Sequence, residues 1–292
     1  MIAGGNMSKT IIKEDNGVKL FSKVKDVHTF DTRTLIFQTN MERLNMGSFN
    51  INKFKGIRII PNEHSGFSYE FDFEYIDPKP WTINKESMEV IGKSMAMIHN
   101  YAYFNSSLIS LNIKEEAYDS MSKWSMLTHP DLSELKVESV LKRMEIFMQI
   151  PRISTMLQPK APLHRDFKPH NIISDGEKFY LIDFDFAAVD FISLEIGGFI
   201  VDIIDSGLDN VESFLKAYLS VIDVPILIHS VVDDYLNYLC TNNFPFYLSD
   251  SLDKDSLINL INHRNHSLDI LWQNRDNVND IIKNILYFHE IN

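Results

Sequence analysis

Residues 163–171 read LHRDFKPHN, and residues 181–185 read LIDFD. The first stretch has the spacing H-x-D-x-x-x-x-N, and the second is an apolar–apolar–Asp step. Together they are typical of a phosphoryl-transfer site in which one Asp handles a hydroxyl proton and an Asn/Asp pair holds magnesium. A single Asp or His would be weak support. Several compatible side chains at compatible spacing favour this site over an ordinary polar hairpin.

The loop itself supplies a base and a cation. Transfer of a γ-phosphoryl group needs an acceptor oxygen in line with the phosphorus and positive charge near the phosphate oxygens. We expect Asp166 to accept the proton of the acceptor hydroxyl. Lys168, just beyond it, is expected to neutralise charge that grows on the γ-phosphate.

The chain after this loop returns as a hairpin. Residues 172–173 and 179–182 read as strands around a polar turn, so Asp183 should lie beside Asn171. The side-chain oxygens of these two residues are hard ligands that suit Mg²⁺ bridging phosphates. Asp185 is a candidate second contact to the metal, and a surface acid is the alternative.

The composition bounds the class of protein. The 292 residues are 45% hydrophobic, enough for one large domain or two lobes, and the net charge of −12 argues against nucleic acid as a partner. That charge is compatible with a cationic acceptor, although surplus acid more often serves solubility. The single cysteine, Cys240, excludes a disulfide framework, and no secretory signal or membrane-spanning apolar run is found. We therefore expect a cytoplasmic protein, monomeric or homodimeric, with no membrane partner.

The first residues have the character of a nucleotide-binding loop. Residues 4–9 read GGNMSK, and two short strands follow at 9–13 and 18–21, around the tight-turn signal DNG. A glycine loop before a hairpin can lay backbone N–H groups over phosphates, and a flexible chain end is the alternative. The candidate residues of this loop are Gly4, Gly5, Asn6 and Ser8.

The second strand offers three lysines for the α- and β-phosphates. Lys19, Lys23 and Lys25 share one strand face, because side chains alternate along a strand. We favour Lys19, which comes early on the strand, and a solvated lysine is the alternative.

A helix is expected at 32–44, with Asp31 as its cap. In kinase-like sites such a helix offers an acid that fixes the lysine. Glu42 is its only carboxylate and lies near the end, whereas Gln38 is better placed but uncharged.

Two further strands, at 57–60 and 67–75, complete a small sheet. Aromatic and polar residues alternate along the second one, as a half-buried strand requires. Pro78 and Pro80 then end regular structure and mark the boundary between two lobes. Backbone groups just before this boundary are candidates to bond an adenine edge, and an ordinary linker is the alternative. The residues concerned are Glu74, Tyr75 and Ile76.

The rest of the chain reads mainly as helices. The helix at 84–103 has an apolar face formed by Met88, Ile91, Met95 and Ile98. The helix at 132–147 has a face formed by Leu135, Val140, Leu141 and Met144. Glu195 either hydrogen-bonds back to the catalytic loop or serves as a helix-start acid. Most acids beyond residue 199 should be solvated, but five are candidates to bind a cationic acceptor: Asp202, Asp205, Asp209, Asp233 and Asp234.

These segments resemble the superfamily of aminoglycoside phosphotransferases and choline kinases. The loop residues His164, Asp166 and Asn171 and the step Ile182-Asp183 carry the specific likeness. Supporting likeness comes from the nucleotide loop and strand at 4–10, the hinge at 73–76, the helix end at 96–99, and residues 190–197, where Glu195 stands in place of the usual Asp.

The resemblance implies an α+β, two-lobed, protein-kinase-like fold. A small N-terminal lobe at 1–77, an antiparallel sheet with one helix, would bind the nucleotide, and a larger, mostly helical lobe at 78–292 would hold the acceptor. The implied activity is Mg²⁺-dependent transfer from ATP or GTP to a hydroxyl of an aminoglycoside-, choline- or sugar-like molecule. His164 would belong to the catalytic set, and Ile182 would contact the nucleotide.

Two alternatives remain open. Arg165 and Lys168 give the loop the form H-R-D-x-K-P-x-N of eukaryotic protein kinases. However, only the 11 residues 184–194 separate Asp183 from Glu195, which leaves little room for an activation segment. The other alternative is a pseudokinase that binds nucleotide without catalysis. The short N-terminus prompts it, and the intact catalytic and metal residues argue against it.

Overall fold

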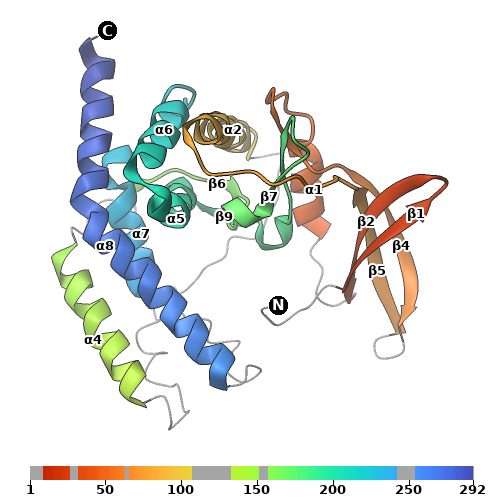
Figure 1. Ribbon diagram of the computed structural model, residues 1–292, viewed down its shortest axis with the longest axis horizontal. Helices are drawn as coiled ribbons and strands as arrows, with labels where there is room; N and C mark the ends of the chain where they lie inside the picture. The colour runs from red at the N-terminus through yellow and green to blue at the C-terminus, as the bar shows by residue number, and fades with distance from the viewer. Residues whose placement is uncertain are drawn as a thin grey trace.

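The computed structural model describes residues 9–26, 32–62, 66–106, 133–150, 157–241 and 254–291. Their arrangement is two-lobed, with a small lobe built on an antiparallel sheet and a large lobe built mainly of helices (Figure 1). This confirms the predicted α+β architecture. The glycine loop predicted at residues 4–8 and the helix cap predicted at Asp31 lie outside the described residues.

The small lobe is a four-stranded sheet with one helix. Its strands are antiparallel and follow the order β1-β2-β5-β4. The elements of this lobe are β1 (Lys9–Asp15), β2 (Val18–Asp26), α1 (Thr32–Met41), β4 (Phe54–Asn62) and β5 (Gly66–Glu74). At the predicted tight turn, Asn16 and Gly17 have φ values of 52° and 79°. Such left-handed pairs match the twist of a hairpin, which explains why the DNG signal was reliable.

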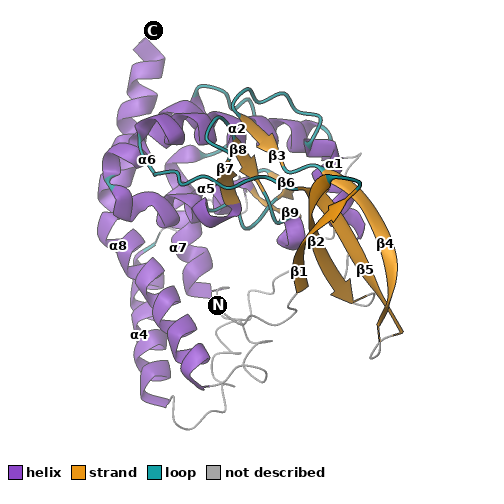
Figure 2. Ribbon diagram, turned by 45° about the vertical axis from the view of Figure 1, so that its right-hand side comes forward, coloured by secondary structure: helices purple, strands orange, loops and turns teal. Residues whose placement is uncertain are grey.

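A second, smaller sheet connects the two lobes. Strand β3 (Phe49–Ile51) runs parallel to β8 (Phe179–Leu181), and β8 pairs with β7 (Ile172–Ser174) (Figure 2). The chain that follows α1 is therefore anchored to the hairpin beyond the catalytic loop. The backbone N–H of Lys79 also donates to the carbonyl of Ser174, at 2.7 Å. The division at residue 77 stays a prediction: the pairing of β3 with β8 crosses it, whereas the bond between Lys79 and Ser174 lies within the larger part.

The large lobe packs its helices around α2 (Lys85–Phe104). Asn84 begins this helix with a capping box that it shares with Ser87. The four apolar residues predicted to share a face of this helix are all fully buried. Gly92 lies against α6 (Leu208–Leu219), and a Cβ there would come within 2.5 Å of the Phe214 carbonyl oxygen. The close approach of α2 and α6 therefore requires glycine at this position.

The predicted apolar face of α4 (Ser133–Gln149) is wrong. Leu141 and Met144 are 61% and 45% exposed, whereas Arg143 is 2% exposed. The guanidinium of Arg143 donates to the carbonyl of Leu239 and, at 3.3 Å, to Asn265 Oδ1. These acceptors come from α7 (Val231–Thr241) and α8 (Lys254–Ile291), so a satisfied polar group decides which side of α4 faces the lobe. The predicted face also includes Leu135 and Val140, whose side chains lie outside the described set.

Among the helices that the structure describes, none combines the length and the apolar character needed to cross a lipid bilayer. The longest, α8, has charged and amide side chains distributed along its length.

Candidate active site

The catalytic loop connects two pieces of regular structure. Strand β6 (Lys160–Leu163) pairs antiparallel with β9 (Ala188–Phe191) and delivers the chain to His164. A short 3-10 helix, η4 (Pro169–Asn171), then turns it into β7. The sequence favours this turn because Pro169 presets the backbone at the start of η4. Between these ends the loop presents Asp166 on one side of the helical lobe.

Asp166 is held by two neighbours on its own loop. The side-chain amide of Asn171 donates to the Asp166 carboxylate at 2.7 Å and to its backbone carbonyl at 2.8 Å. The other carboxylate oxygen lies 2.5 Å from the ammonium of Lys168. This arrangement fixes the carboxylate and leaves it partly exposed, as a general base requires.

His164 was predicted as a catalytic residue, but the structure places it in the core. It is fully buried, its Nδ1 accepts from the backbone N–H of Asp166 at 3.2 Å, and its Nε2 donates to the carbonyl of Ile182 at 2.9 Å. Burial lowers the pKa of His164, which favours the neutral ring that these two bonds require. His164 is therefore a positioning residue, which ties the catalytic loop to the strand that leads to Asp183.

Glu195, on α5 (Ile192–Ile203), fixes the same loop from behind, as one of the two sequence interpretations predicted. Its Oε1 accepts from the backbone N–H of Arg165 at 2.5 Å, and its Oε2 lies 2.8 Å from Nε2 of His99, whose Nδ1 contacts the Tyr218 hydroxyl at 2.8 Å. Burial alone would raise the pKa of Glu195, but the hydrogen bond and charge of His99 outweigh it and hold that pKa below its usual value.

The contacts of Glu195 stabilise an unusual backbone. Arg165 has a φ of 62°, in the left-handed region that non-glycine residues rarely adopt. Its guanidinium Nε also binds Asp190 Oδ2 at 3.0 Å. Such a conformation persists only where surrounding contacts enforce it, and here Glu195 and Asp190 provide them.

Replacement of Glu195 by Ala should lower the free energy of unfolding by about 3–5 kcal/mol, because a buried charge partner and a backbone acceptor are both lost. Because the pKa of Glu195 is lowered in the folded protein, its ionised carboxylate contributes fully to stability above about pH 4.5, the usual pKa of the side chain. This stabilisation is lost as the pH falls below that value. Denaturant unfolding between pH 3 and 7 measures both effects. Glu195→Gln should show a smaller loss of stability below pH 4.5 than the unchanged protein, and an identical acid profile would contradict this role.

Asp183 lies next to Asn171, as the hairpin predicted. The backbone N–H of Ile182 donates to the Asn171 carbonyl at 3.0 Å, so Asp183 follows immediately after this pairing. Asp183 has a φ of 65°, and its Oδ1 lies 2.8 Å from Nζ of Lys23. Burial would raise the pKa of Asp183, but the charge of Lys23 outweighs it, and the carboxyl titrates below its usual range.

The lysine beside this site is Lys23, which corrects the preference for Lys19. Lys23 is 8% exposed and pairs across the sheet with Phe71, in the middle of β2. Lys19 is exposed near the hairpin turn, and its ammonium lies over the ring of Tyr75, 5.5 Å from the centroid. Both lysines share a strand face, but of the two it is Lys23 that forms an ion pair with Asp183.

We expect Lys23→Met to weaken nucleotide binding or turnover by about 10- to 100-fold, the effect of losing one hydrogen bond to a charged group. Lys19→Met is the matched control, since it removes the same charge from the same strand face. Kinetics in ATP concentration would compare the two, and a larger loss in the Lys19 variant would reverse the assignment.

The other side chains predicted near the lysine have different partners. Asp185, a candidate metal ligand, lies 2.5 Å from Lys25 and 3.6 Å from Lys23. Gln38 donates to the Asn52 carbonyl at 2.7 Å, and Glu42 accepts from the backbone of Phe54 at 2.8 Å. Ion pairs of the two lysines with Asp183 and Asp185 therefore take the place of the expected pair between lysine and the helix acid.

Asn171 and Asp183 fit a magnesium ion. Both amide hydrogens of Asn171 are directed to Asp166, and its side-chain oxygen accepts no hydrogen bond from the residues the structure describes. Together with the Asp183 carboxylate it offers hard oxygen ligands at the adjoining ends of the paired strands β7 and β8. No group of three or more His, Cys, Asp or Glu side chains in the described ranges is arranged as a metal site. Two protein ligands are within the usual number for Mg²⁺, which commonly takes one or two together with phosphates and water.

The predicted adenine contacts lie in the connection between the lobes. Residues 75–78 link β5 to the segment before α2, and Tyr75 and Ile76 are half-buried. The backbone N–H of Glu74 donates to the Lys53 carbonyl at 2.8 Å, so this group is already used within the sheet. Ile182, predicted to contact the nucleotide, is also half-buried.

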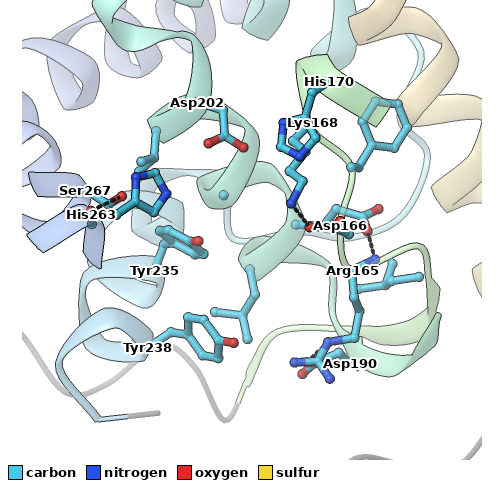
Figure 3. Close-up of a pocket in the computed structure, with 16 residues that line it drawn as sticks. Arg165, Asp166, Lys168, His170, Asp190, Asp202, Tyr235, Tyr238, His263 and Ser267 are labelled. Atoms are coloured by element: carbon cyan, nitrogen blue, oxygen red, sulfur yellow. Dashed lines mark hydrogen bonds and ion pairs between the residues drawn. The ribbon is translucent and has the colours of Figure 1, made fainter. Parts of the chain in front are cut away.

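A cavity of about 300 Å³ lies beside Asp166 in the helical lobe (Figure 3). It is bounded by the catalytic loop and by side chains from three helices: Asp202 from α5, Tyr235 and Tyr238 from α7, and His263 from α8. Neither tyrosine is among the site residues predicted from the sequence. Only the spacing of one helical turn between them, which puts them on one side of α7, could have suggested a shared surface.

Of the five acids proposed for acceptor binding, only Asp202 lines this cavity. The other four have partners elsewhere. Asp205 pairs with His266 at 3.6 Å, Asp209 with Lys85 at 3.0 Å, Asp233 with Arg275 at 2.6 Å, and buried Asp234 accepts from Gln158 at 2.7 Å.

Comparisons with known proteins agree with this geometry. Residues 124–225 match the model of the phosphotransferase enzyme family, APH. An amicoumacin kinase, hAmiN, solved in complex with AMP-PNP, Ca²⁺ and Ami, has a TM-score of 0.63 at 14% identity, over 92% of this chain and 87% of that chain. A microcompartment-associated aminopropanol kinase has a TM-score of 0.65 at 11% identity, over 95% and 91%. The choline kinase LicA from Streptococcus pneumoniae has a TM-score of 0.54 at 14% identity, over 92% of each chain. Comparison with curated proteins gives no match.

The fold is of the two-lobed, protein-kinase-like class found in these solved kinases, and residues 124–225 are similar to the phosphotransferase enzyme family. The segment that matches the family model, 102 of the 292 residues, contains the loop on which the resemblance to aminoglycoside phosphotransferases and choline kinases rests.

Proposed function

We propose that this protein transfers the γ-phosphoryl group of ATP or GTP to a hydroxyl of a small molecule, with Mg²⁺ as the metal. The observation that carries the proposal is that Asn171 binds the Asp166 carboxylate and pairs with the residue before Asp183, while Asp166 lines a cavity of about 300 Å³. The cavity adjoins the carboxylate that would take the acceptor's proton. The proposed metal ligands flank two paired strands: Asn171 comes just before β7, and Asp183 comes just after β8.

Each residue has one task in the transfer. Asp166 accepts the hydroxyl proton as the acceptor oxygen forms its bond to the γ-phosphorus, and the bond from that phosphorus to the β–γ bridging oxygen breaks, which releases ADP or GDP. Asn171 and Asp183 would hold Mg²⁺, which would supply positive charge to the phosphates. Lys23 exchanges its contact with Asp183 for the phosphates, and Lys168 stabilises charge near the transferred group.

The structure disfavours a protein substrate. The residues between Asp183 and Glu195 form η5 (Phe184–Phe186), β9 and the start of α5 with almost no intervening loop. β9 is paired with β6 along its whole length. No loop remains there to act as an activation segment or a peptide platform.

The proposal is tested with purified protein, Mg²⁺ and γ-labelled ATP or GTP against amino alcohols, sugars, aminoglycosides and peptides. We expect label on a small-molecule hydroxyl, dependent on Mg²⁺ and abolished by EDTA. Label on peptides alone would replace the proposal with a protein kinase. Binding of nucleotide without transfer to any acceptor would favour a pseudokinase.

A further inference from the structure

Lys23 has no acid available on the helix of its own lobe. Helix α1 reads TRTLIFQTNM and contains no carboxylate. Gln38 and Glu42, the two side chains expected to support the lysine, are hydrogen-bonded to backbone groups elsewhere. Among the residues that the structure describes, the ion pairs of Lys23 are with Asp183, at 2.8 Å, and with Asp185, at 3.6 Å. Both acids come from the segment that follows β8 in the large lobe.

Asp185 is a carboxylate that two lysines share. Its Oδ2 lies 3.6 Å from Nζ of Lys23, and its Oδ1 lies 2.5 Å from Nζ of Lys25. The side chains of these lysines, on one face of β2, are 10% and 14% exposed. Ion pairs that are largely buried are screened less by salt than exposed ones. Two neighbouring ammonium groups would also repel each other, so a carboxylate that contacts both stabilises their positions.

A buried phenylalanine fixes the acids on either side of it. Phe184 is 3% exposed and begins the short 3-10 helix η5. Its ring packs edge-on against Phe37 of α1, with centroids 5.8 Å apart, and against His164 of the catalytic loop, at 4.5 Å. These contacts hold the backbone of η5 in place. The position of Asp185 is therefore set by the core beneath the catalytic loop.

The two acids would have different tasks once a nucleotide is bound. Asp183 directly follows the residue that pairs with Asn171, and it is the proposed metal ligand. Lys23 would therefore exchange its contact with Asp183 for the phosphates. Asp185 is occupied with lysines alone among the contacts described above. A lysine that gives up one carboxylate and keeps the other retains a restricted side chain, which lowers the entropy cost of binding a phosphate.

We propose that Asp185 is the positioning residue for Lys23, in the part that an acid on the helix was expected to play. With nucleotide bound, Asp185 holds the Lys23 ammonium toward the phosphates, and Lys25 holds Asp185 in turn. The lysine is thus positioned by the large lobe and not by the helix of its own lobe. This inference rests on the proposed function for the presence of the nucleotide.

The first test measures nucleotide affinity with the full chain and no acceptor. Calorimetry with Mg²⁺ and ATP, or GTP where ATP does not bind, compares Asp185→Asn with the unchanged protein. We expect about 10-fold weaker binding, the effect of losing one contact between charged groups. Asp185→Glu keeps the charge and should recover most of the affinity. Unchanged affinity in Asp185→Asn, or an equal loss in Asp185→Glu, overturns the proposal.

The second test asks whether Asp185 acts through Lys23. In a Lys23→Met background, Asp185→Asn should weaken nucleotide binding by less than about twofold, because the group that it positions is already gone. Lys19→Met is the matched background, since Lys19 lies over the ring of Tyr75 and the full effect of Asp185→Asn should remain there. A further 10-fold loss in the Lys23→Met background would show a merely structural role and overturn the proposal.

The same measurements separate this inference from the proposed function. Nucleotide binding that depends on Lys23 but not on Asp185 overturns the positioning role and leaves the kinase function standing. Failure of the unchanged protein to bind either nucleotide overturns both. Coupling between the two residues in nucleotide binding, without transfer of phosphate to any acceptor, supports the positioning role and counts against the kinase function.

Discussion

Asp166→Asn is expected to reduce kcat by about 10²- to 10⁴-fold, the usual contribution of general base catalysis. An amide cannot accept the hydroxyl proton, but it can keep an oxygen near Lys168, which lies 2.5 Å from the present carboxylate. The side chain is also partly exposed, so the substitution leaves no unpaired buried charge. The loss should therefore appear in turnover and not in folding.

The measurement for Asp166 combines steady-state phosphoryl transfer with thermal unfolding. Nucleotide-induced stabilisation should be retained in Asp166→Asn, because the role proposed for this residue is contact with the acceptor and not with the metal. Turnover at the unchanged rate would remove Asp166 from the mechanism. Loss of both turnover and nucleotide binding would instead indicate a structural effect on the loop.

Asp183→Asn should also reduce turnover strongly, by about 10²-fold or more, because metal-ion catalysis supplies several kcal/mol of charge stabilisation. The variant should fold, since Asn tolerates the left-handed backbone that Asp183 adopts, with its φ of 65°. The apparent affinity for Mg²⁺ should fall in parallel, as measured by the Mg²⁺ dependence of the rate.

Asp185→Asn is the matched control for Asp183. Asp185 forms ion pairs with Lys25 and Lys23. Asp183, in contrast, comes directly after Ile182, whose backbone N–H donates to the Asn171 carbonyl. We expect a smaller loss of turnover and an unchanged Mg²⁺ dependence. A rightward shift in Mg²⁺ dependence equal to that of Asp183→Asn would restore Asp185 as a metal ligand.

Reasoning from the sequence predicted several of the residues that meet at the candidate site. The H-x-D-x-x-x-x-N loop, the Asp after the hairpin and the role of Glu195 behind the loop depend on short-range spacing, and the structure brings these residues together. The same reasoning misassigned His164. A motif gives the position of a side chain along the chain, but it does not tell whether that side chain faces the cleft or the core.

Local sequence determined the elements of this protein and the loop that joins them. Alternation of side chains defines the strands, helical periodicity defines the buried face of α2, and Asn16-Gly17 sets a turn that few other pairs adopt. The order of His164, Asp166 and Asn171 fixes the catalytic loop because those residues contact each other within a few positions.

Only the tertiary structure decided which distant residues complete the site. Lys19 and Lys23 share a strand face, so the alternation of side chains along the strand does not distinguish them. The packing of the small lobe on the large lobe places Lys23 beside Asp183 and Lys19 over the ring of Tyr75. Five acids looked alike in sequence, yet helix packing brings only Asp202 to the cavity. The physical reason is that these choices depend on contacts between segments far apart in the chain, whose geometry no local pattern records.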